Sequence, residues 1–282
     1  MISLVDALDM EGHRIVGWLP SHHTCGCPDG RLNCLTRKET FQLGSTIINV
    51  QARHRWLESH PARFIPELPE RYIKLFSHRG ETVLDPFCGS GTTNVVAKGL
   101  GRNSIGVDIN PRSTAMTISR LNQTDEPEST NHLIMTGDSR KALMNLPLGA
   151  VDLAVTSPPY FDVVDYQHDD SDQIGNWHDY SGFLEALKEV FECCYDVLKE
   201  NGHLVVNTQD LYKGNLKAPI HSDYINICKS IGFEIININI YVLNYSNGGR
   251  LVFGYPKSYY PKNDHEFNLI FRKSPQFGAI NA

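Results

Sequence analysis

Short apolar runs rich in β-branched residues alternate with amphipathic segments from residue 82 towards the end of the chain. Most runs lack the strict apolar–polar alternation of a strand with one wet face, which is typical of strands buried on both faces. We therefore predict seven strands, over residues 82–87, 104–109, 132–137, 151–156, 203–208, 233–243 and 266–271.

Segments between the first six runs show the apolar periodicity of amphipathic helices. In the longest segment, Phe183, Leu187 and Val190 fall on one apolar stripe. Asn201-Gly202 is predicted to end that helix, because both residues tolerate the left-handed conformation. The sixth and seventh strands have no helix between them, so we expect them to pair antiparallel. The clearest helices are predicted over residues 92–100, 111–121, 180–199 and 219–231.

Strands that alternate with helices predict an α/β fold, in which helices cover both faces of a mostly parallel sheet. Residues 1–80 break this pattern, with a loop-rich start and a helix-like stretch over residues 60–77. We therefore divide the chain into an N-terminal extension, residues 1–58, and a main domain, residues 59–282.

Composition and charge add modest constraints. The chain is 41% hydrophobic and 21% charged, as globular proteins are. The net charge of −6 disfavours a nucleic-acid partner, but the charge is unevenly spread, with eleven acids against two bases over residues 162–200. No apolar run approaches the roughly 20 residues that span a bilayer, and the first residues do not resemble a signal peptide. We expect a soluble protein of the prokaryotic cytoplasm or nucleoid, without a membrane partner.

Seven cysteines make a disulfide framework a poor interpretation, because the number is odd and nothing indicates secretion. Cys25, Cys27 and Cys34 follow His22-His23 and are metal-capable types. Their C-x-C-x6-C spacing lacks the paired C-x2-C of strong zinc motifs. The sequence therefore predicts no metal site.

The strongest chemical signal is a glycine loop between the first predicted strand and its helix. Gly89 and Gly91 permit positive φ and a close approach of backbone N–H groups to a ligand, and the helix N-terminus favours an anionic group. The loop lacks the lysine of a phosphate-binding P-loop. An ordinary tight turn is the alternative for the glycines alone. The candidate cofactor-binding residues here are Asp85, Pro86, Phe87, Cys88, Gly89, Ser90, Gly91 and Thr92.

Polar residues also end the second and third predicted strands. Asp108, followed by Ile109, stands where an acid can accept hydrogen bonds from a ribose diol. Asp138 and Ser139 end the third strand and are further cofactor candidates. Both aspartates are also in place to cap the helices that follow them. The carboxyl ends of parallel strands share one edge, so we expect these residues to converge there.

The fourth predicted strand ends in Ser157, Pro158, Pro159 and Tyr160, the candidate catalytic residues. The exocyclic amine of a nucleobase is a poor nucleophile, because its lone pair is delocalised into the ring. A hydroxyl such as Ser157 Oγ, with a backbone carbonyl near Pro158, can accept the amine N–H groups. The prolines stiffen the chain, and Tyr160 offers a face for stacking a base. A proline turn after a strand is the alternative.

Asp-Pro-Phe-Cys-Gly-Ser-Gly-Thr, residues 85–92, resembles the cofactor loop of amino-group DNA methyltransferases. Ser-Pro-Pro-Tyr, residues 157–160, resembles the catalytic motif of their N4-cytosine members. The resemblance implies a Rossmann-like class I methyltransferase fold with a seven-stranded, mostly parallel sheet and an antiparallel last strand. It also implies S-adenosyl-L-methionine as cofactor, and places Asp138 near the adenine amino group. His265-Glu266-Phe267 resembles the final family motif, which supports the base pocket.

The function implied is site-specific methylation of the N4 amine of a cytosine flipped out of double-stranded DNA, in a restriction–modification system. A cognate restriction endonuclease is then a candidate partner. Recognition would fall to residues 1–58, 161–179 and 244–264, since no large recognition domain is evident. The alternatives are N6-adenine methylation, whose enzymes more often carry Asp or Asn before Pro-Pro, tRNA guanine-N2 methylation, and an inactive relative that binds nucleic acid. The cofactor motif precedes the catalytic motif, whereas many N4-cytosine enzymes have the opposite order.

Overall fold

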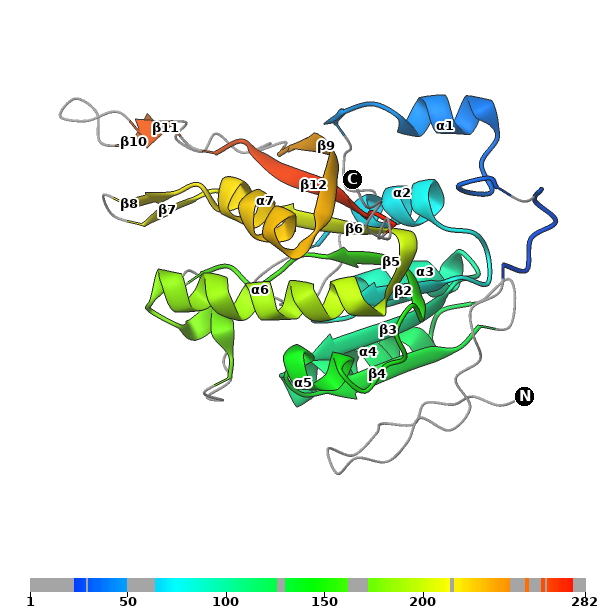
Figure 1. Ribbon diagram of the computed structural model, residues 1–282, viewed down its shortest axis with the longest axis horizontal. Coiled ribbons are helices and arrows are strands. Elements are labelled where there is room, and N and C mark those ends of the chain that lie inside the picture. Colours follow the sequence, from blue (N-terminus) through cyan, green and yellow to red (C-terminus); the bar gives the residue numbers. More distant parts are fainter. Residues whose placement is uncertain are drawn as a thin grey trace, which may run out of the picture.

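The computed structural model describes residues 23–28, 30–49, 64–125, 130–161, 172–213, 216–243, 252–253, 260–261 and 263–275. Within these ranges, eight strands form the central sheet (Figure 1): β1 (Ile47–Ile48), β2 (Thr82–Asp85), β3 (Asn103–Asp108), β4 (His132–Thr136), β5 (Val151–Thr156), β6 (Leu198–Thr208), β9 (Phe233–Val242) and β12 (His265–Lys273). Two small antiparallel ribbons pair β7 (Leu211–Lys213) with β8 (Leu216–Ala218), and β10 (Val252–Phe253) with β11 (Tyr260–Pro261).

The helices lie on both faces of the sheet (Figure 1). They are α1 (Arg37–Leu43), α2 (Glu67–Phe76), α3 (Thr92–Gly99), α4 (Pro111–Asn122), α5 (Ser139–Leu143), α6 (Tyr180–Val197) and α7 (Ile220–Ile231), with a 3-10 turn over Ile174–Asn176. α5, α6 and α7 pack in a row on one face, and α2, α3 and α4 on the other. None of the helices in the described part of the chain is long and apolar enough to cross a membrane.

The strand order is β1-β9-β12-β6-β5-β2-β3-β4. All seven predicted strands are present, and β12 runs antiparallel to both neighbours, so the predicted fold is confirmed. β1 is an eighth strand, from the N-terminal extension, and pairs in parallel with β9. The order reverses between β2 and β5, which are adjacent. Parallel α/β sheets bind ligands at the carboxyl ends of the strands beside such a reversal.

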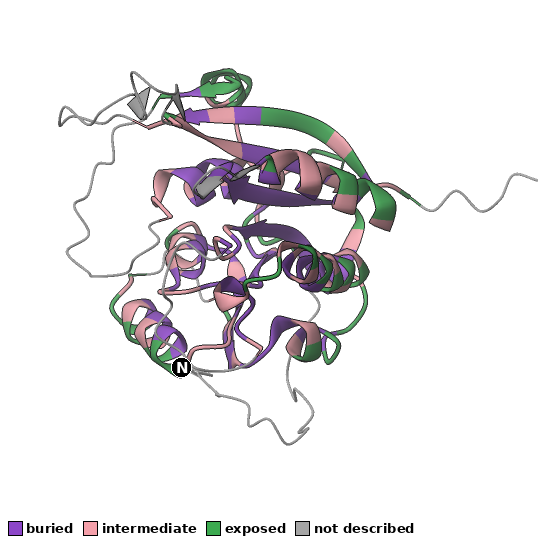
Figure 2. Ribbon diagram, turned by 90° about the vertical axis from the view of Figure 1, so that its left-hand side faces the viewer, coloured by how far each residue is buried: buried purple, intermediate pink, exposed green. Residues whose placement is uncertain are grey.

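Apolar side chains fill the space on both faces of the sheet, and Figure 2 shows the buried strands between the two helical layers. Neighbouring residues of β2 point to opposite faces, as the strand pleat requires. Leu84 joins the core with Phe183 and Phe191 of α6, whereas Val83 joins the core with Tyr72 and Ile73 of α2. Because β2 is buried on both sides, its carboxyl end is held rigidly at the reversal point.

The long helix ends earlier than its sequence predicts. α6 stops at Val197, and Leu198 is extended and pairs with Val151 in the sheet. Lys273 of β12 donates its ammonium group to the carbonyl of Leu198 over 2.9 Å. Asn201 does adopt the left-handed conformation, with φ 65°, but inside β6. Sheet pairing therefore ends the helix, and not the Asn-Gly pair.

Candidate active site

Glycine conformation shapes the loop between β2 and α3. Gly89 and Gly91 have φ values of 52° and 81°. Gly91 is the N-cap residue of α3. A Cβ atom at Gly91 would lie 2.4 Å from Cγ2 of Thr117 on α4. Positive φ and this close approach both exclude other side chains, so the loop requires glycine for backbone reasons that the sequence predicted.

Asp108, at the end of β3, holds this loop in place. Its Oδ2 accepts a hydrogen bond from the backbone N–H of Gly89 over 2.9 Å, and its Oδ1 accepts one from Asn110 N–H, also over 2.9 Å. The cap of α4 is Asn110, whose side chain accepts from Arg112 N–H. The capping alternative for Asp108 is therefore wrong. Asp108 and Ile109 are half-buried beside the glycine loop, and their contact with the cofactor stays a prediction.

Asp138, at the end of β4, is the N-cap of α5 and accepts from Arg140 N–H over 2.9 Å. The guanidinium of Arg140 also pairs with this carboxylate at 2.9 Å and with Glu189 of α6 at 3.0 Å. The capping alternative applies here, and a cofactor contact of Asp138 stays a prediction. The Ser139 hydroxyl donates to the carbonyl of Pro86. β4 is thereby tied to the glycine loop.

Asp85 connects the glycine loop to β5, the strand that precedes the candidate catalytic residues. The side chain is buried at the end of β2. Its Oδ2 accepts from the hydroxyl of Thr93 on α3 over 2.6 Å, and its Oδ1 from the hydroxyl of Thr156 on β5 over 2.7 Å. Burial raises the pKa of Asp85 to about 6. Because Ser157 follows Thr156 directly, the tips of β2 and β5 form one continuous edge.

Ser157 lies in a polar network at this edge. Its hydroxyl donates to Oδ1 of Asn207 on β6 over 3.3 Å, and the Asn207 amide donates to Glu266 of β12 over 3.0 Å. A serine hydroxyl has one proton and two lone pairs. With the proton directed to Asn207, the lone pairs can accept N–H groups from a substrate amine. Burial raises the pKa of Glu266.

Sequence analysis missed Asn207. The predicted strand 203–208 includes it, and the buried network explains why a polar residue interrupts an apolar run near the strand end. Recognising its role requires knowledge that β6 is the direct neighbour of β5. Glu266 was connected with the base pocket through the motif around it, and the structure brings it to Asn207.

The remaining catalytic candidates follow Ser157 in an irregular segment. Pro158 is buried, and Pro159 and Tyr160 are half-buried. Tyr160 packs partly against the core on the α6 face. Phe161 anchors the end of the segment, with its ring centroid 5.2 Å from that of Phe183. The segment is therefore fixed at both ends, by Asp85 through Thr156 and by this aromatic contact.

Two predicted recognition segments lie largely outside the described residues, which omit 162–171 and 244–251. Of the acidic stretch after the catalytic motif, Asp172 pairs with Lys141 at 2.9 Å. Asp179 caps α6. Two described acids of this stretch therefore have structural roles, Asp172 in an ion pair and Asp179 as a helix cap.

Comparison with known proteins identifies the family. A family of DNA methylases, of the N6 and N4 type, matches residues 33–118 and 151–281. The chain belongs to this DNA methylase family. Membership confirms the predicted resemblance and the predicted cofactor, S-adenosyl-L-methionine. The glycine loop with its positive φ values and the half-buried Asp108 beside it fit that cofactor.

Individual relatives match this chain over short stretches. The type II methyltransferase M.BglI of Bacillus subtilis is 39% identical over 93 residues, which cover 30% of this chain and 26% of the relative. The type II methyltransferase M.MjaI of Methanocaldococcus jannaschii is 48% identical over 63 residues, 22% and 21% of the two chains. The matches therefore span about a quarter of the relatives' lengths.

Among solved structures, a Thermus thermophilus protein described as a putative DNA modification methylase, complexed with S-adenosyl-L-methionine, is 26% identical to this chain. The overlap covers 50% of this chain and 53% of that one, with a TM-score of 0.38. The candidate functional residues are assigned from the geometry of the strand ends.

The buried carboxyl of Asp85 predicts a distinctive pH dependence of stability. Its pKa of about 6 exceeds the ordinary value of 3.8, so the folded chain binds this proton more tightly than the unfolded chain. The stability contributed by this group therefore falls as pH rises from about 4 to about 6. Relative to wild type, Asp85→Asn should gain up to about 3 kcal/mol in unfolding free energy across this interval.

Urea denaturation between about pH 4 and pH 7 measures this relative gain. Asp196→Asn, at an exposed position on α6, is the matched control and should follow wild type throughout. A difference between Asp85→Asn and wild type that stays constant with pH would contradict the raised pKa.

Asp108 and Asn110 are neighbours with separable roles. Asp108→Ala should weaken binding of S-adenosyl-L-methionine by about 1–3 kcal/mol, or roughly 5- to 150-fold, because it removes polar partners of the loop and of the ribose. Asn110→Ala should cost about 1 kcal/mol of stability through the lost helix cap and leave affinity nearly unchanged. Isothermal titration calorimetry and urea denaturation measure the two effects. Equal affinities of Asp108→Ala and wild type would remove Asp108 from the cofactor site.

Proposed function

We propose that this DNA methylase is a site-specific enzyme of a restriction–modification system that methylates the N4 amine of cytosine in double-stranded DNA. The observation that supports the base assignment is the Ser157 hydroxyl, a neutral acceptor oriented by Asn207 at the tip of β5. The N6-adenine relatives that the sequence resembles more often carry Asp or Asn at this position. N6-adenine methylation is the second candidate, because the family includes both types.

The reaction proposed is a direct displacement. The bound cofactor supplies a methyl group on a sulfonium. The cytosine nitrogen forms the new N–C bond as the C–S bond breaks, and the nitrogen then releases a proton to water. Ser157 accepts an N–H of the amine and so holds its lone pair out of the ring plane. Positioning of this kind can supply several kcal/mol of the rate enhancement.

The rigidity of the segment supports this proposal. Asp85 ties the glycine loop to Thr156, so cofactor loop and amine acceptor belong to one hydrogen-bonded unit. The amine of a paired cytosine is stacked and hydrogen-bonded inside the duplex, so the base must be flipped out to reach Ser157. Tyr160 is half-buried, and its exposed part is the proposed stacking face.

The product of the reaction tests both the polymer and the base. The full chain is incubated with methyl-labelled cofactor and either double-stranded DNA of mixed sequence or tRNA, and the nucleosides are then separated. We expect label in N4-methylcytosine from DNA. Label in N6-methyladenine would move the proposal to adenine, and label in tRNA alone would overturn it. Binding of cofactor without transfer to any substrate would support an inactive relative.

Ser157→Ala tests the catalytic role. Loss of the amine acceptor should lower turnover by about 10²-fold or more, as the loss of a positioned polar group in an active site does. Affinity for S-adenosyl-L-methionine should stay within about twofold, because Ser157 belongs to the β5 tip and not to the glycine loop. Ser230→Ala, at an exposed serine of α7, is the matched control. Turnover of Ser157→Ala equal to that of the control would exclude the proposed role.

Asn207→Ala complements this test. It removes the acceptor of the Ser157 proton, so the hydroxyl can rotate and donate in place of accepting. We expect reduced turnover, with part of the activity restored in Asn207→Gln if the longer amide reaches the hydroxyl. Unchanged turnover in Asn207→Ala would confine this residue to a packing role.

A further inference from the structure

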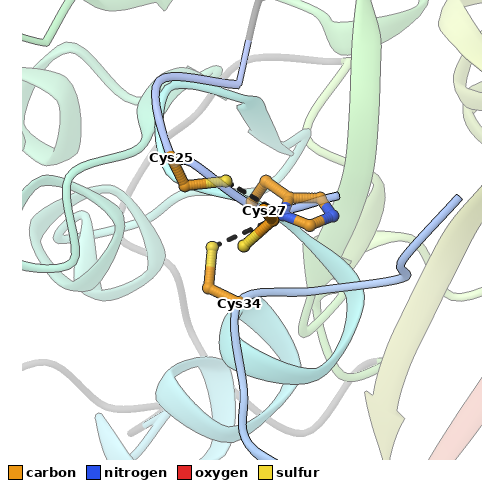
Figure 3. A group of neighbouring side chains, drawn as sticks. Cys25, Cys27 and Cys34 are labelled. Carbon is orange, nitrogen blue, oxygen red and sulfur yellow. Dashed lines mark hydrogen bonds between the residues drawn. The ribbon is translucent and has the colours of Figure 1, made fainter. Parts of the chain in front are cut away.

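Three thiols and one imidazole meet at a point far from the catalytic residues in sequence. The possible ligand atoms of Cys25, Cys27, Cys34 and His78 all lie within 4.8 Å of one another. Figure 3 shows the three cysteine side chains turned towards a common centre. The cysteines come from the N-terminal extension, and His78 from the turn between α2 and β2. Two separate parts of the chain thus contribute to one cluster.

The spacing within the cluster fits a tetrahedral zinc ion. His78 Nδ1 lies 3.2 Å from Cys25 Sγ and 3.4 Å from Cys34 Sγ. Zinc binds thiolate sulfur at about 2.3 Å and imidazole nitrogen at about 2.0 Å, so tetrahedral angles separate sulfur from nitrogen by about 3.5 Å. The observed distances are close to this value. Small movements of the side chains suffice to admit the ion.

The histidine is oriented as a metal ligand requires. Nε2 of His78 lies 2.8 Å from the backbone carbonyl of Arg31, to which its N–H donates. This hydrogen bond places the proton on Nε2 and leaves the lone pair of Nδ1 directed at the thiols. Ligating histidines commonly make such a bond with their other ring nitrogen. The His78 side chain is also buried, with 6% exposure, which holds the ring in this orientation.

The charge of the surroundings suits an occupied site. A zinc ion with three thiolates and a neutral imidazole carries a net charge of about −1. The buried guanidinium of Arg102 interacts electrostatically with Cys34 and Cys25, and it donates to the carbonyl of Ser77, next to His78, over 2.8 Å. Glu81 also interacts electrostatically with Arg102, and the negative charge of the occupied cluster adds to the counter-charge that a buried cation needs.

We propose that Cys25, Cys27, Cys34 and His78 bind one zinc ion that holds the N-terminal extension on the catalytic domain. Three thiolates with one imidazole are a donor set of structural zinc sites. The role is structural, because four protein ligands leave no open position. His78 precedes β2, so the site lies at the amino end of the strands, opposite Ser157 at their carboxyl end.

Hydrogen bonds around the cluster support its role as an attachment point. Thr24 N–H donates to the carbonyl of Arg79 over 2.7 Å, and the Asn33 side chain donates to the carbonyl of Leu75 over 2.7 Å. Both bonds join the cysteine-bearing segment to the region around His78. The site was not predicted from the C-x-C-x6-C spacing, because its fourth ligand stands 44 residues beyond Cys34.

Metal content of the full chain tests the proposal. Protein purified with a thiol reductant and without chelator is analysed by inductively coupled plasma mass spectrometry. We expect one zinc per chain in wild type, and a loss of more than 90% in the Cys34→Ser/His78→Ala double variant. Cys193→Ser changes a half-buried thiol outside the cluster and is the matched control. It should retain the full zinc content.

Two measurements on wild type avoid dependence on variants that fold poorly. After exchange of zinc for cobalt, the absorption spectrum should show the intense visible bands of a tetrahedral thiolate site. It should also show the bands of sulfur-to-metal charge transfer. Removal of zinc by a strong chelator should lower the midpoint of thermal unfolding, and added zinc should restore it. His23→Ala should behave as wild type, although His23 Nδ1 lies 3.7 Å from Cys25 Sγ.

Several results would overturn the proposal. One such result is the absence of zinc from reduced wild type after incubation with excess metal. Another is a double variant that retains as much zinc as Cys193→Ser. Loss of zinc in His23→Ala with retention in His78→Ala would remove His78 from the site. A disulfide among the three cysteines in freshly purified protein kept with zinc would assign the cluster to redox chemistry. None of these results depends on the base that the enzyme methylates.

Discussion

The hydrogen bonds of the buried Asp85 carboxylate are the interactions on which the edge with the candidate active site depends. They join the ends of β2 and β5 at the reversal of strand order, and join both to the first turn of α3. Burial of a carboxylate is costly unless hydrogen bonds compensate it. Two threonine hydroxyls and a backbone N–H of Phe87 offset part of that cost, and burial still raises the pKa of Asp85. The glycine loop and the catalytic segment therefore cannot shift independently of each other.

Three aspartates at the ends of neighbouring strands serve different purposes, although the sequence places them alike. Asp85 is a buried connector, Asp108 holds the backbone of the glycine loop, and Asp138 caps α5 and pairs with Arg140. Their surroundings decide the difference. Asp108 alone is half-buried rather than buried, so it is the carboxylate of the three best exposed to meet a ligand. Position at a strand end alone therefore does not decide which aspartate can contact a cofactor.

The sequence predicted the elements well because their signals are local. Apolar runs mark the strands, and Gly89 and Gly91 predict a tight turn through their backbone requirements. The resemblance of residues 85–92 to a family motif adds the cofactor. Features that depend on distant contacts were missed. The end of α6 is set by the pairing of Leu198 with Val151, and the meaning of Asn207 by the adjacency of β6 and β5. β1, with two residues, is too short for any periodicity to reveal.

The N-terminal extension runs from the amino ends of the strands to their carboxyl ends. Its cysteine cluster lies at the amino end of the strands, beside His78. After α1 the chain reaches β1, where Ile48 pairs with Tyr241, and Tyr241 pairs with Glu266 on the next strand.

Glu266 in turn bonds Asn207 in the Ser157 network. The extension is attached at the amino ends of the strands, and its own strand β1 therefore ends near the Ser157 network, at the carboxyl ends. Attachment of the extension at the amino ends of the strands therefore limits the positions that β1 can take at their carboxyl ends.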